Sequence, residues 1–159
     1  MSLRLRPGVV VVDKREEKSG VPEHLLELGV SVRLEFLEVG DYLLPGDVLV
    51  ERKTARDFLS SLIDGRLFEQ AANLASSSEN PTLIIEGDLS EALERFGRGE
   101  AFWGALASLG YDFKLTLLYT PGSMETAELL AAISKRKREK REEVYLKPRR
   151  KRGSLESFN

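Results

Sequence analysis

Two runs of apolar residues are the sequence feature that most restricts what this chain can fold into. Residues 9–12 are four consecutive valines, as in a strand that is buried on both faces of a sheet. Residues 82–86 read TLIIE directly after Pro81 and predict a second strong strand. A sheet that is covered on both faces is typical of an α/β domain.

Strand and helix patterns alternate along the remainder of the chain. Further strands are predicted for residues 30–39, 48–53 and 113–119, with turns at residues 40–42 and 45–47. Helices are predicted for residues 22–28, 54–63, 66–76, 87–96, 101–109 and 123–133. Strands separated by helices of this length indicate a mixed central β-sheet flanked by helices.

The charge of the chain is divided unevenly between two parts. Residues 1–134 carry thirteen Lys and Arg against twenty-two Asp and Glu, whereas residues 135–152 carry eleven Lys and Arg and three Glu. We expect residues 1–134 to form one globular domain and residues 135–159 to form a basic, disordered tail or linker. Such a tail attracts phosphates of any sequence, but the acidic domain needs another reason to approach nucleic acid.

The residue types that are missing exclude several kinds of chemistry. The chain has no cysteine, which excludes disulfides, thiolate zinc sites and a cysteine nucleophile. Its single histidine, His24, argues against histidine-based triads. Acid–base or metal chemistry must then rest on carboxylates, Lys, Tyr or water. No segment has the length of a membrane span or the pattern of a secretory signal, so we expect an intracellular protein.

The strand predicted at residues 48–53 ends in the charged group Glu51-Arg52-Lys53. Because side chains alternate along a strand, Glu51 and Lys53 share one face at a spacing of about 7 Å, and Arg52 points to the other face. Asp41 precedes Glu51 across one tight turn, and Asp13 ends the first strand. We expect the carboxylates to meet at one end of the sheet.

Such a group has the chemistry that phosphodiester hydrolysis requires. Carboxylate oxygens are preferred ligands of Mg²⁺ and Mn²⁺, and a bound cation activates water and offsets charge on the phosphate. A nearby Lys orients that water or stabilises the developing charge. We therefore interpret Asp41 and Glu51 as metal ligands, Asp13 as a residue near the metal, and Lys53 as the charge-stabilising group. The alternative for residues this common is a solvated strand end with a surface ion pair.

A longer pattern surrounds these residues. It comprises Gly40-Asp41-Tyr42, then Val50-Glu51-Arg52-Lys53 with Asp57-Phe58, then Ser61-Leu62-x-Asp64-Gly65-Arg66-Leu67-Phe68-x-Gln70, and it is preceded by Val-Val-Asp13-x-Arg15-Glu16. This composite resembles the nuclease domain of the XPF/Mus81/Hef family, in particular its archaeal XPF-type structure-specific endonucleases. The resemblance extends in layout over residues 9–134 and is dense over residues 40–70.

The resemblance implies a restriction-endonuclease-like fold for the nuclease domain, residues 1–134. It implies a Mg²⁺- or Mn²⁺-dependent endonuclease of DNA repair or recombination, which cuts 3′-flap, forked or branched DNA near the junction of single-stranded and duplex DNA. Its place would be the cytoplasm and nucleoid, or the nucleus in a eukaryote. The implied catalytic residues are Asp13, Glu16, Asp41, Glu51, Arg52, Lys53 and Asp57.

Three of the motif residues have structural alternatives. Asp57 is also placed to form a capping box with Thr54 as the N-cap of the following helix, and both interpretations can hold. Arg66 and Gln70 lie one helical turn apart and are predicted to face DNA or to brace the site, with a solvated helix face as the alternative.

The resemblance also implies partners. It implies a homodimer formed through this domain; Phe102 and Trp103 are candidates for the dimer surface, with core packing as the alternative. Residues 153–159 faintly resemble a sliding-clamp-binding tail. Family members usually continue into a helix-hairpin-helix domain, and we expect this chain, which stops at Asn159, to be an excised domain or a short relative.

The second functional class is a non-catalytic, nuclease-like module that binds DNA or another subunit. Such modules usually lose the motif carboxylates or the Lys. Asp41, Glu51 and Lys53 are all present in this chain, and this favours the enzyme.

Overall fold

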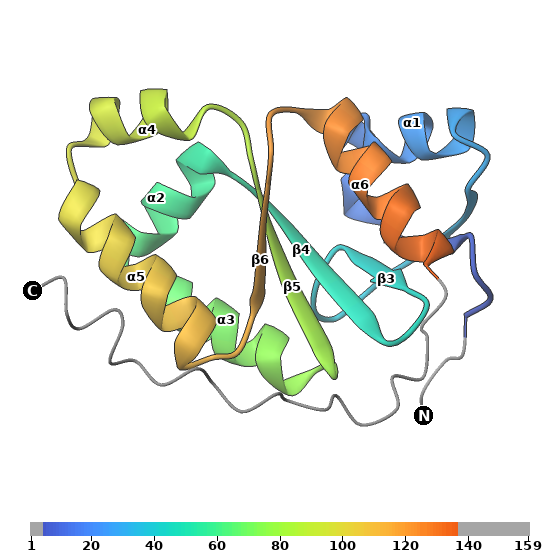
Figure 1. Cartoon of the computed structure of the whole chain (residues 1–159), viewed down its shortest axis with the longest axis horizontal. Coiled ribbons are helices and arrows are strands. Elements are labelled where there is room, and N and C mark those ends of the chain that lie inside the picture. The colour runs from blue at the N-terminus through green and yellow to red at the C-terminus, as the bar shows by residue number, and fades with distance from the viewer. Residues whose placement is uncertain (1–4, 137–159) are drawn as a thin grey trace, which may run out of the picture.

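A six-stranded sheet covered by helices on both faces forms the protein, as Figure 1 shows for the computed structural model, which describes residues 5–136. The elements in chain order are β1 (Val9–Asp13), the 3-10 helix η1 (Lys14–Ser19), α1 (Val21–Glu27), β2 (Ser31–Glu35), β3 (Tyr42–Leu44), β4 (Val48–Thr54), α2 (Ala55–Ile63), α3 (Leu67–Ser76), β5 (Asn80–Glu86), α4 (Leu89–Phe96), α5 (Gly99–Tyr111), β6 (Thr116–Thr120) and α6 (Ser123–Lys135). The predicted α/β class and mixed, helix-flanked sheet are confirmed.

The order of the strands brings several strand ends to one edge of the sheet. The order is β2-β1-β3-β4-β5-β6, and β3 runs antiparallel to both of its neighbours, while the other pairs are parallel. The edge at which β1, β4 and β5 end is therefore the edge at which β3 begins. Asp13 ends β1 and Asp41 precedes β3. The Asp13 N–H donates to the Asp41 carbonyl and the Asp41 N–H to the Val50 carbonyl, both at 2.8 Å, so the three strands are joined there.

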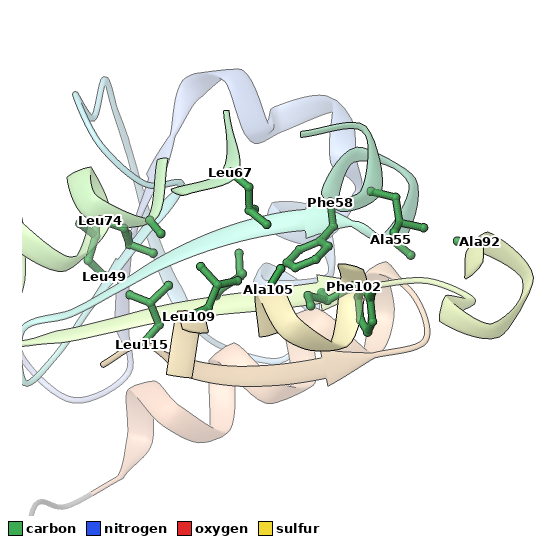
Figure 2. Close-up of a cluster of buried hydrophobic side chains, with 14 residues drawn as sticks. Leu49, Ala55, Phe58, Leu67, Leu74, Ala92, Phe102, Ala105, Leu109 and Leu115 are labelled. Carbon is green, nitrogen blue, oxygen red and sulfur yellow. The ribbon is translucent and has the colours of Figure 1, made fainter. Parts of the chain in front are cut away.

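Two hydrophobic cores lie on opposite faces of this sheet. The first packs β4 and β5 against α2, α3, α4 and α5, and Figure 2 shows its members Phe58 and Phe102 beside these strands. Their rings meet edge to face at 5.3 Å between centroids. The second packs the other face against α1 and α6, with Tyr42 and Leu130 fully buried. Helices on both faces explain why the valines of β1 need no polar alternation.

The alternation of β4 assigns each motif residue to a face. Leu49 belongs to the first core and Val50 to the second. Because the period of a strand is two residues, Glu51 and Lys53 continue the face of Leu49, and Arg52 continues the face of Val50. The predicted division of these three side chains is confirmed.

β2 is shorter than predicted because side chains from β1 and η1 bind its continuation. The Leu37 N–H donates to Asp13 Oδ1 at 2.8 Å, and the Leu37 carbonyl accepts from Arg15 Nη2 at 2.7 Å. With both backbone groups of Leu37 occupied, the ladder with β1 cannot continue beyond Glu35.

β3 was missed in the sequence because it has only three residues and directly follows a turn. Tyr42, predicted in that turn, is fully buried and pairs with Val50 of β4. The turn requires a glycine: Gly40 has φ +80, and a Cβ at this position would lie 2.7 Å from Leu49 Cδ1. The predicted connection at residues 45–47 does form the tight link from β3 to β4.

Near β6 the chain also departs from prediction. Helix α5 continues through Gly110 to Tyr111, and β6 starts at Thr116 instead of residue 113. The N–H groups of Phe113 and Leu115 bond to the carbonyls of Ser108 and Leu109, so the residues between helix and strand satisfy the end of the helix.

The remaining structural expectations concern the candidate dimer residues and the C-terminal tail. Phe102 is buried, as its core alternative predicted, whereas Trp103 is 57% exposed. Helix α6 ends at Lys135, and residues 137–159, which include almost all of the predicted tail and the candidate clamp-binding residues 153–159, lie outside the described residues. Within residues 5–136, no helix has the length and apolarity needed to cross a bilayer.

Candidate active site

A cavity of about 290 Å³ opens at the edge where β1 and β4 end and β3 begins. Asp13, Asp41 and Glu51 all line it, so the structure brings together the three carboxylates for which the sequence predicted a meeting. The rest of the lining comprises Arg15, Glu38, Val39, Gly40, Gln70 and Asn73. We name this space the carboxylate cavity.

Asp41 is held at the centre of this edge in an unfavourable electrostatic environment. Its Oδ2 accepts a hydrogen bond from the backbone N–H of Arg52 at 2.8 Å. Burial, followed by the negative charge of Glu16, raises the pKa of Asp41 to about 7, and the charge of Glu51 acts in the same direction. The protein therefore places carboxylates close together without neutralising them fully.

Glu51 has a similar environment but a cation nearby. Burial raises the pKa of Glu51, and the charge of Lys53 opposes this shift. Among the described residues, the Glu51 carboxylate makes no hydrogen bond or ion pair within the usual distance limits, and neither does the Lys53 ammonium. Both groups are therefore available to a ligand that enters from solvent.

Asp13 differs because its oxygens are already occupied. Its Oδ2 accepts from the Arg15 Nε at 2.7 Å and from the Arg15 backbone N–H at 3.1 Å, and its Oδ1 accepts from Leu37 N–H and Arg15 Nη2. The hydrogen bond from Arg15 lowers the pKa of Asp13. In this arrangement Asp13 lines the cavity and anchors the segment around Leu37; the prediction that it lies near a metal remains a prediction.

Glu16 and Arg52 form an ion-pair network on the other face of β4. Arg52 Nε lies 2.7 Å from Glu16 Oε1, and Arg52 Nη1 lies 2.9 Å from Glu86 Oε1. Tyr42 Oη donates to Glu16, and Thr126 Oγ1 donates to Glu86. The three charged side chains are only 11–14% exposed. Neither Glu16 nor Arg52 lines the carboxylate cavity, so this network braces the strand end from behind.

Asp57 and Arg66 lie outside the cavity lining, and Gln70 lies within it. The Thr54 hydroxyl accepts the Asp57 N–H at 3.1 Å, which confirms the Thr54 cap; the Asp57 side chain is exposed. Arg66 is exposed and paired with Asp64 at 3.2 Å. Gln70, on α3, lines the cavity, and its buried Oε1 has no hydrogen-bond partner among residues 5–136.

Three polar or charged lining residues, Arg15, Glu38 and Asn73, were not proposed as site residues from the sequence. Arg15 belongs to the motif Val-Val-Asp13-x-Arg15-Glu16, and its position two residues after Asp13 could have indicated that it lies at the site. Glu38 and Asn73 gave no signal, because both are exposed polar residues of common type, and only the fold brings them to the rim.

A larger cavity of about 780 Å³ lies at the opposite edge of the sheet and carries no such chemistry. Its lining is mainly apolar, with Leu118, Leu129 and Ile133 among its members, and it includes no Asp or Glu. Among residues 5–136, the acidic groups that fit a phosphodiester site are those of the carboxylate cavity.

The carboxylate cavity fits a hydrated divalent cation. The described residues contain no group of three or more Asp, Glu or His side chains that is close enough to hold a metal ion. Mg²⁺ does not need one, since it commonly keeps several waters and binds through one or two carboxylates together with phosphate oxygens of the substrate. Asp41 and Glu51 offer such a pair: neither makes an ion pair among residues 5–136, and of their four oxygens only Asp41 Oδ2 accepts a hydrogen bond there.

A mixed six-stranded sheet with helices on both faces and acidic residues at one edge defines the class as a restriction-endonuclease-like domain. The structure matches that of XPF from Aeropyrum pernix in complex with DNA with a TM-score of 0.75 and 42% sequence identity, over 81% of this chain and 64% of that one. The family model of the ERCC4 domain matches residues 12–133, and the chain therefore belongs to the ERCC4 domain family.

Curated relatives agree with this assignment. The 3′-flap repair endonuclease Xpf of Saccharolobus solfataricus is 35% identical over 127 residues, which are 80% of this chain and 54% of that protein. The DNA repair endonuclease XPF of Mus musculus is 35% identical over 138 residues, or 15% of its length. A putative ATP-dependent RNA helicase of Methanocaldococcus jannaschii is 38% identical over 17% of its length. This chain thus spans about half of the archaeal Xpf and much less of the others.

The names of these relatives support nuclease activity. The archaeal and mouse proteins are both named as repair endonucleases, and each is 35% identical to about four fifths of this chain. The chain is therefore homologous to XPF-family endonucleases.

Proposed function

We propose that the protein is a divalent-metal-dependent endodeoxyribonuclease that cuts 3′-flap, forked or branched DNA near the single-strand/duplex junction. The observation that carries this proposal is the pair Asp41 and Glu51, two partly buried carboxylates with raised pKa values that line one cavity. Lys53 lies outside the lining, but its charge acts on Glu51, and it makes no ion pair among residues 5–136. The archaeal relative's name, a 3′-flap repair endonuclease, supports the choice of substrate.

Each residue has a distinct part in this proposal. Asp41 and Glu51 hold Mg²⁺ or Mn²⁺, and the cation, when bound, supplies an activated water and charge stabilisation. Lys53 stabilises negative charge that develops on the phosphate, or orients the attacking water. Asp13 and Arg15 fix the rim of the cavity, and Arg52 with Glu16 fixes the strand from the opposite face. Arg66 is proposed to contact DNA, and Asp57 to act at the site, only when substrate is bound.

The uneven distribution of charge along the chain supports a proposal about how the protein approaches DNA. The domain is acidic, so the cation must bridge the cavity and the phosphodiester, while the basic residues after 134 supply attraction that does not depend on sequence. A homodimer would place two such surfaces on one branched DNA and raise the effective concentration of each. The exposed Trp103 is a candidate for its interface. Action on DNA implies a location in the cytoplasm and nucleoid, or in the nucleus.

The second candidate is a nuclease-like module without catalysis that binds DNA or a partner subunit. The acidic domain and the exposed Trp103 are compatible with it. The intact set of Asp41, Glu51 and Lys53 favours the enzyme, because a binding module gains nothing from two uncompensated carboxylates at the proposed DNA surface.

A cleavage assay separates the two candidates. A labelled 3′-flap duplex is incubated with the wild-type protein and with Asp41→Ala and Glu51→Ala, in Mg²⁺, in Mn²⁺ and in EDTA. The enzyme predicts metal-dependent cutting near the junction by the wild type alone. Absence of metal-dependent cutting by the wild type, or equal cutting by either variant, would refute the proposal.

A further inference from the structure

Gln70 lines the carboxylate cavity, and its side chain carries an acceptor without a partner among residues 5–136. Its side-chain Oε1 has almost no contact with solvent and no hydrogen-bond partner in the described part of the chain. Two other buried atoms share this description, His24 Nδ1 and Glu35 Oε2, but each has an ionisable neighbour, Glu27 at 3.6 Å and Arg33 at 3.5 Å. A buried acceptor without a partner destabilises the folded state, so its position needs an explanation.

The helix that carries Gln70 is firmly placed. Leu67, Ala71 and Leu74 of α3 are buried in the first core, and the Gln70 N–H donates to the Arg66 carbonyl at 3.1 Å. Gln70 lies on the side of this helix that lines the cavity, together with Asn73 one turn later. The packing of a rigid helix, and not a mobile loop, therefore holds Gln70 at the cavity.

The chemistry of an unsatisfied acceptor selects what approaches it. Phosphate oxygens are themselves acceptors, so a DNA backbone that entered the cavity would leave the Gln70 oxygen unpaired. A water bound to a divalent cation carries two strong donors, and Mg²⁺ and Mn²⁺ in sites with two carboxylates keep several such waters. Among the described residues, neither Asp41 nor Glu51 makes an ion pair, and the Gln70 oxygen has no donor. A hydrated cation satisfies all three groups.

We propose that Gln70 is a positioning residue of the cation site, whose amide oxygen accepts a hydrogen bond from a water on the metal held by Asp41 and Glu51. This inference rests on the proposed function, since it needs a divalent cation between those carboxylates. It replaces a direct DNA contact as the role of Gln70. Partners of this kind orient the groups around a metal, and their loss typically lowers metal affinity 10- to 100-fold.

The test measures Mn²⁺ affinity by calorimetry without DNA, for wild type, Gln70→Leu and Gln70→Glu. Gln70→Leu keeps the size of the side chain and removes the acceptor, and we expect a 10- to 100-fold weaker Kd. Gln70→Glu keeps an acceptor and should bind Mn²⁺ at least as tightly as wild type. Glu69→Leu, at an exposed α3 position outside the cavity lining, is the matched control and should change the Kd less than about twofold.

Two further measurements exclude other roles. In EDTA, Gln70→Leu should unfold at the same or a higher temperature than wild type, because it removes an unpaired buried acceptor. In EDTA it should also bind flap DNA as wild type does. If Gln70→Leu does not fold, Gln70→Ala is measured in the same way with the same expectation.

The outcomes that overturn the inference are distinct from failure of the proposed function. An unchanged Mn²⁺ Kd for Gln70→Leu overturns the inference. If this variant also unfolds at a lower temperature than wild type, Gln70 is a packing residue. If it instead binds DNA more weakly in EDTA, Gln70 is a DNA contact. In both cases wild type still binds Mn²⁺ through Asp41 and the proposed function stands. If wild type binds no Mn²⁺, the proposed function and this inference fall together.

Discussion

The backbone N–H of Arg52 donates a hydrogen bond to Asp41 Oδ2 at 2.8 Å. This bond fixes the Asp41 carboxylate against the backbone of β4. At the same strand end, Glu51 and Lys53 project from one face of β4, and Arg52 projects from the other. Asp41 lies in a turn, but this hydrogen bond ties its side chain to a strand of the sheet. Within residues 5–136, Oδ1 of Asp41 accepts no hydrogen bond, so the same contact positions the carboxylate and leaves one oxygen for another ligand.

The raised pKa of Asp41 predicts a dependence of stability on pH in the absence of metal. The folded protein holds this proton up to about pH 7, whereas the unfolded chain releases it near 3.8. Between these values the folded state binds more protons, so this group lowers the free energy of unfolding as pH rises from about 4 to 7. Asp41→Asn, which keeps an acceptor for Arg52 N–H, should be as stable as wild type at pH 4 and more stable at pH 8, by on the order of 2 kcal/mol.

Urea unfolding in EDTA at a series of pH values measures this difference. Asp47→Asn is not a suitable control, because Asp47 Oδ2 accepts a hydrogen bond from the backbone N–H of Glu79, next to β5. Asp64→Asn is suitable, since Asp64 is exposed and paired only with the exposed Arg66. A wild-type and Asp41→Asn difference that does not grow from pH 4 to 8 would contradict the assigned environment of Asp41.

Removing Arg52 should destabilise the fold. Arg52→Ala leaves Glu16 and Glu86 buried without their cation, and loss of one partner of a buried ion pair costs about 3–5 kcal/mol. Arg56→Ala is the matched control, because the Arg56–Glu91 pair is exposed and such pairs contribute less than about 1 kcal/mol. Chemical denaturation measures both. If Arg52→Ala retains wild-type stability and loses only cleavage, Arg52 acts in catalysis and not as a brace.

A methyl group at Gly40 should damage the site through the backbone. Gly40→Ala combines a left-handed φ of +80 with a Cβ placed 2.7 Å from Leu49 Cδ1, whereas Gly46→Ala has a similar φ of +84 and open space around the Cβ. Both variants carry the backbone strain, and only the first adds the clash. We expect Gly40→Ala to be less stable than Gly46→Ala by about 1–3 kcal/mol. Equal stabilities would show that the turn before Asp41 is not tightly packed.

Loss of the charge at Lys53 should slow cleavage without unfolding the protein. Lys53 makes no ion pair among residues 5–136 and is only partly buried, so Lys53→Met should change the free energy of unfolding little. The single-turnover rate on a 3′-flap duplex should fall by about 10²–10³, the usual effect of removing one charge-stabilising group. Lys114→Met, before β6 at the opposite edge of the sheet, should cut at the wild-type rate. A wild-type rate for Lys53→Met would remove Lys53 from the mechanism.

The elements that the sequence predicted well are those with many apolar residues in register. The valines of β1 and the TLIIE run of β5 were identified because burial on both faces leaves an unbroken pattern. β3 was not identified, because three residues after a turn carry too little pattern. The end of β2 depended on Asp13 and Arg15 binding Leu37 across the fold, and no local feature of residues 36–39 shows this.

The candidate site shows the same division. The spacing of Glu51 and Lys53 and the turn before Asp41 were local and predictable, and their meeting with Asp13 followed from strand order. The partners of Arg52 were not predictable, because Glu16 and Glu86 are 36 and 34 residues away in sequence. The unsatisfied oxygen of Gln70 is a property of packing alone, and a sequence motif does not reveal it.

The central claim is that Asp41 and Glu51 hold the cation, and a crystal soaked in Mn²⁺ tests it most directly. Anomalous scattering from Mn²⁺ locates the ion without reference to activity. We predict one strong anomalous peak in the carboxylate cavity, within coordination distance of carboxylate oxygens of both Asp41 and Glu51. A well-ordered cavity without such a peak, or a peak that contacts neither carboxylate, would contradict the claim.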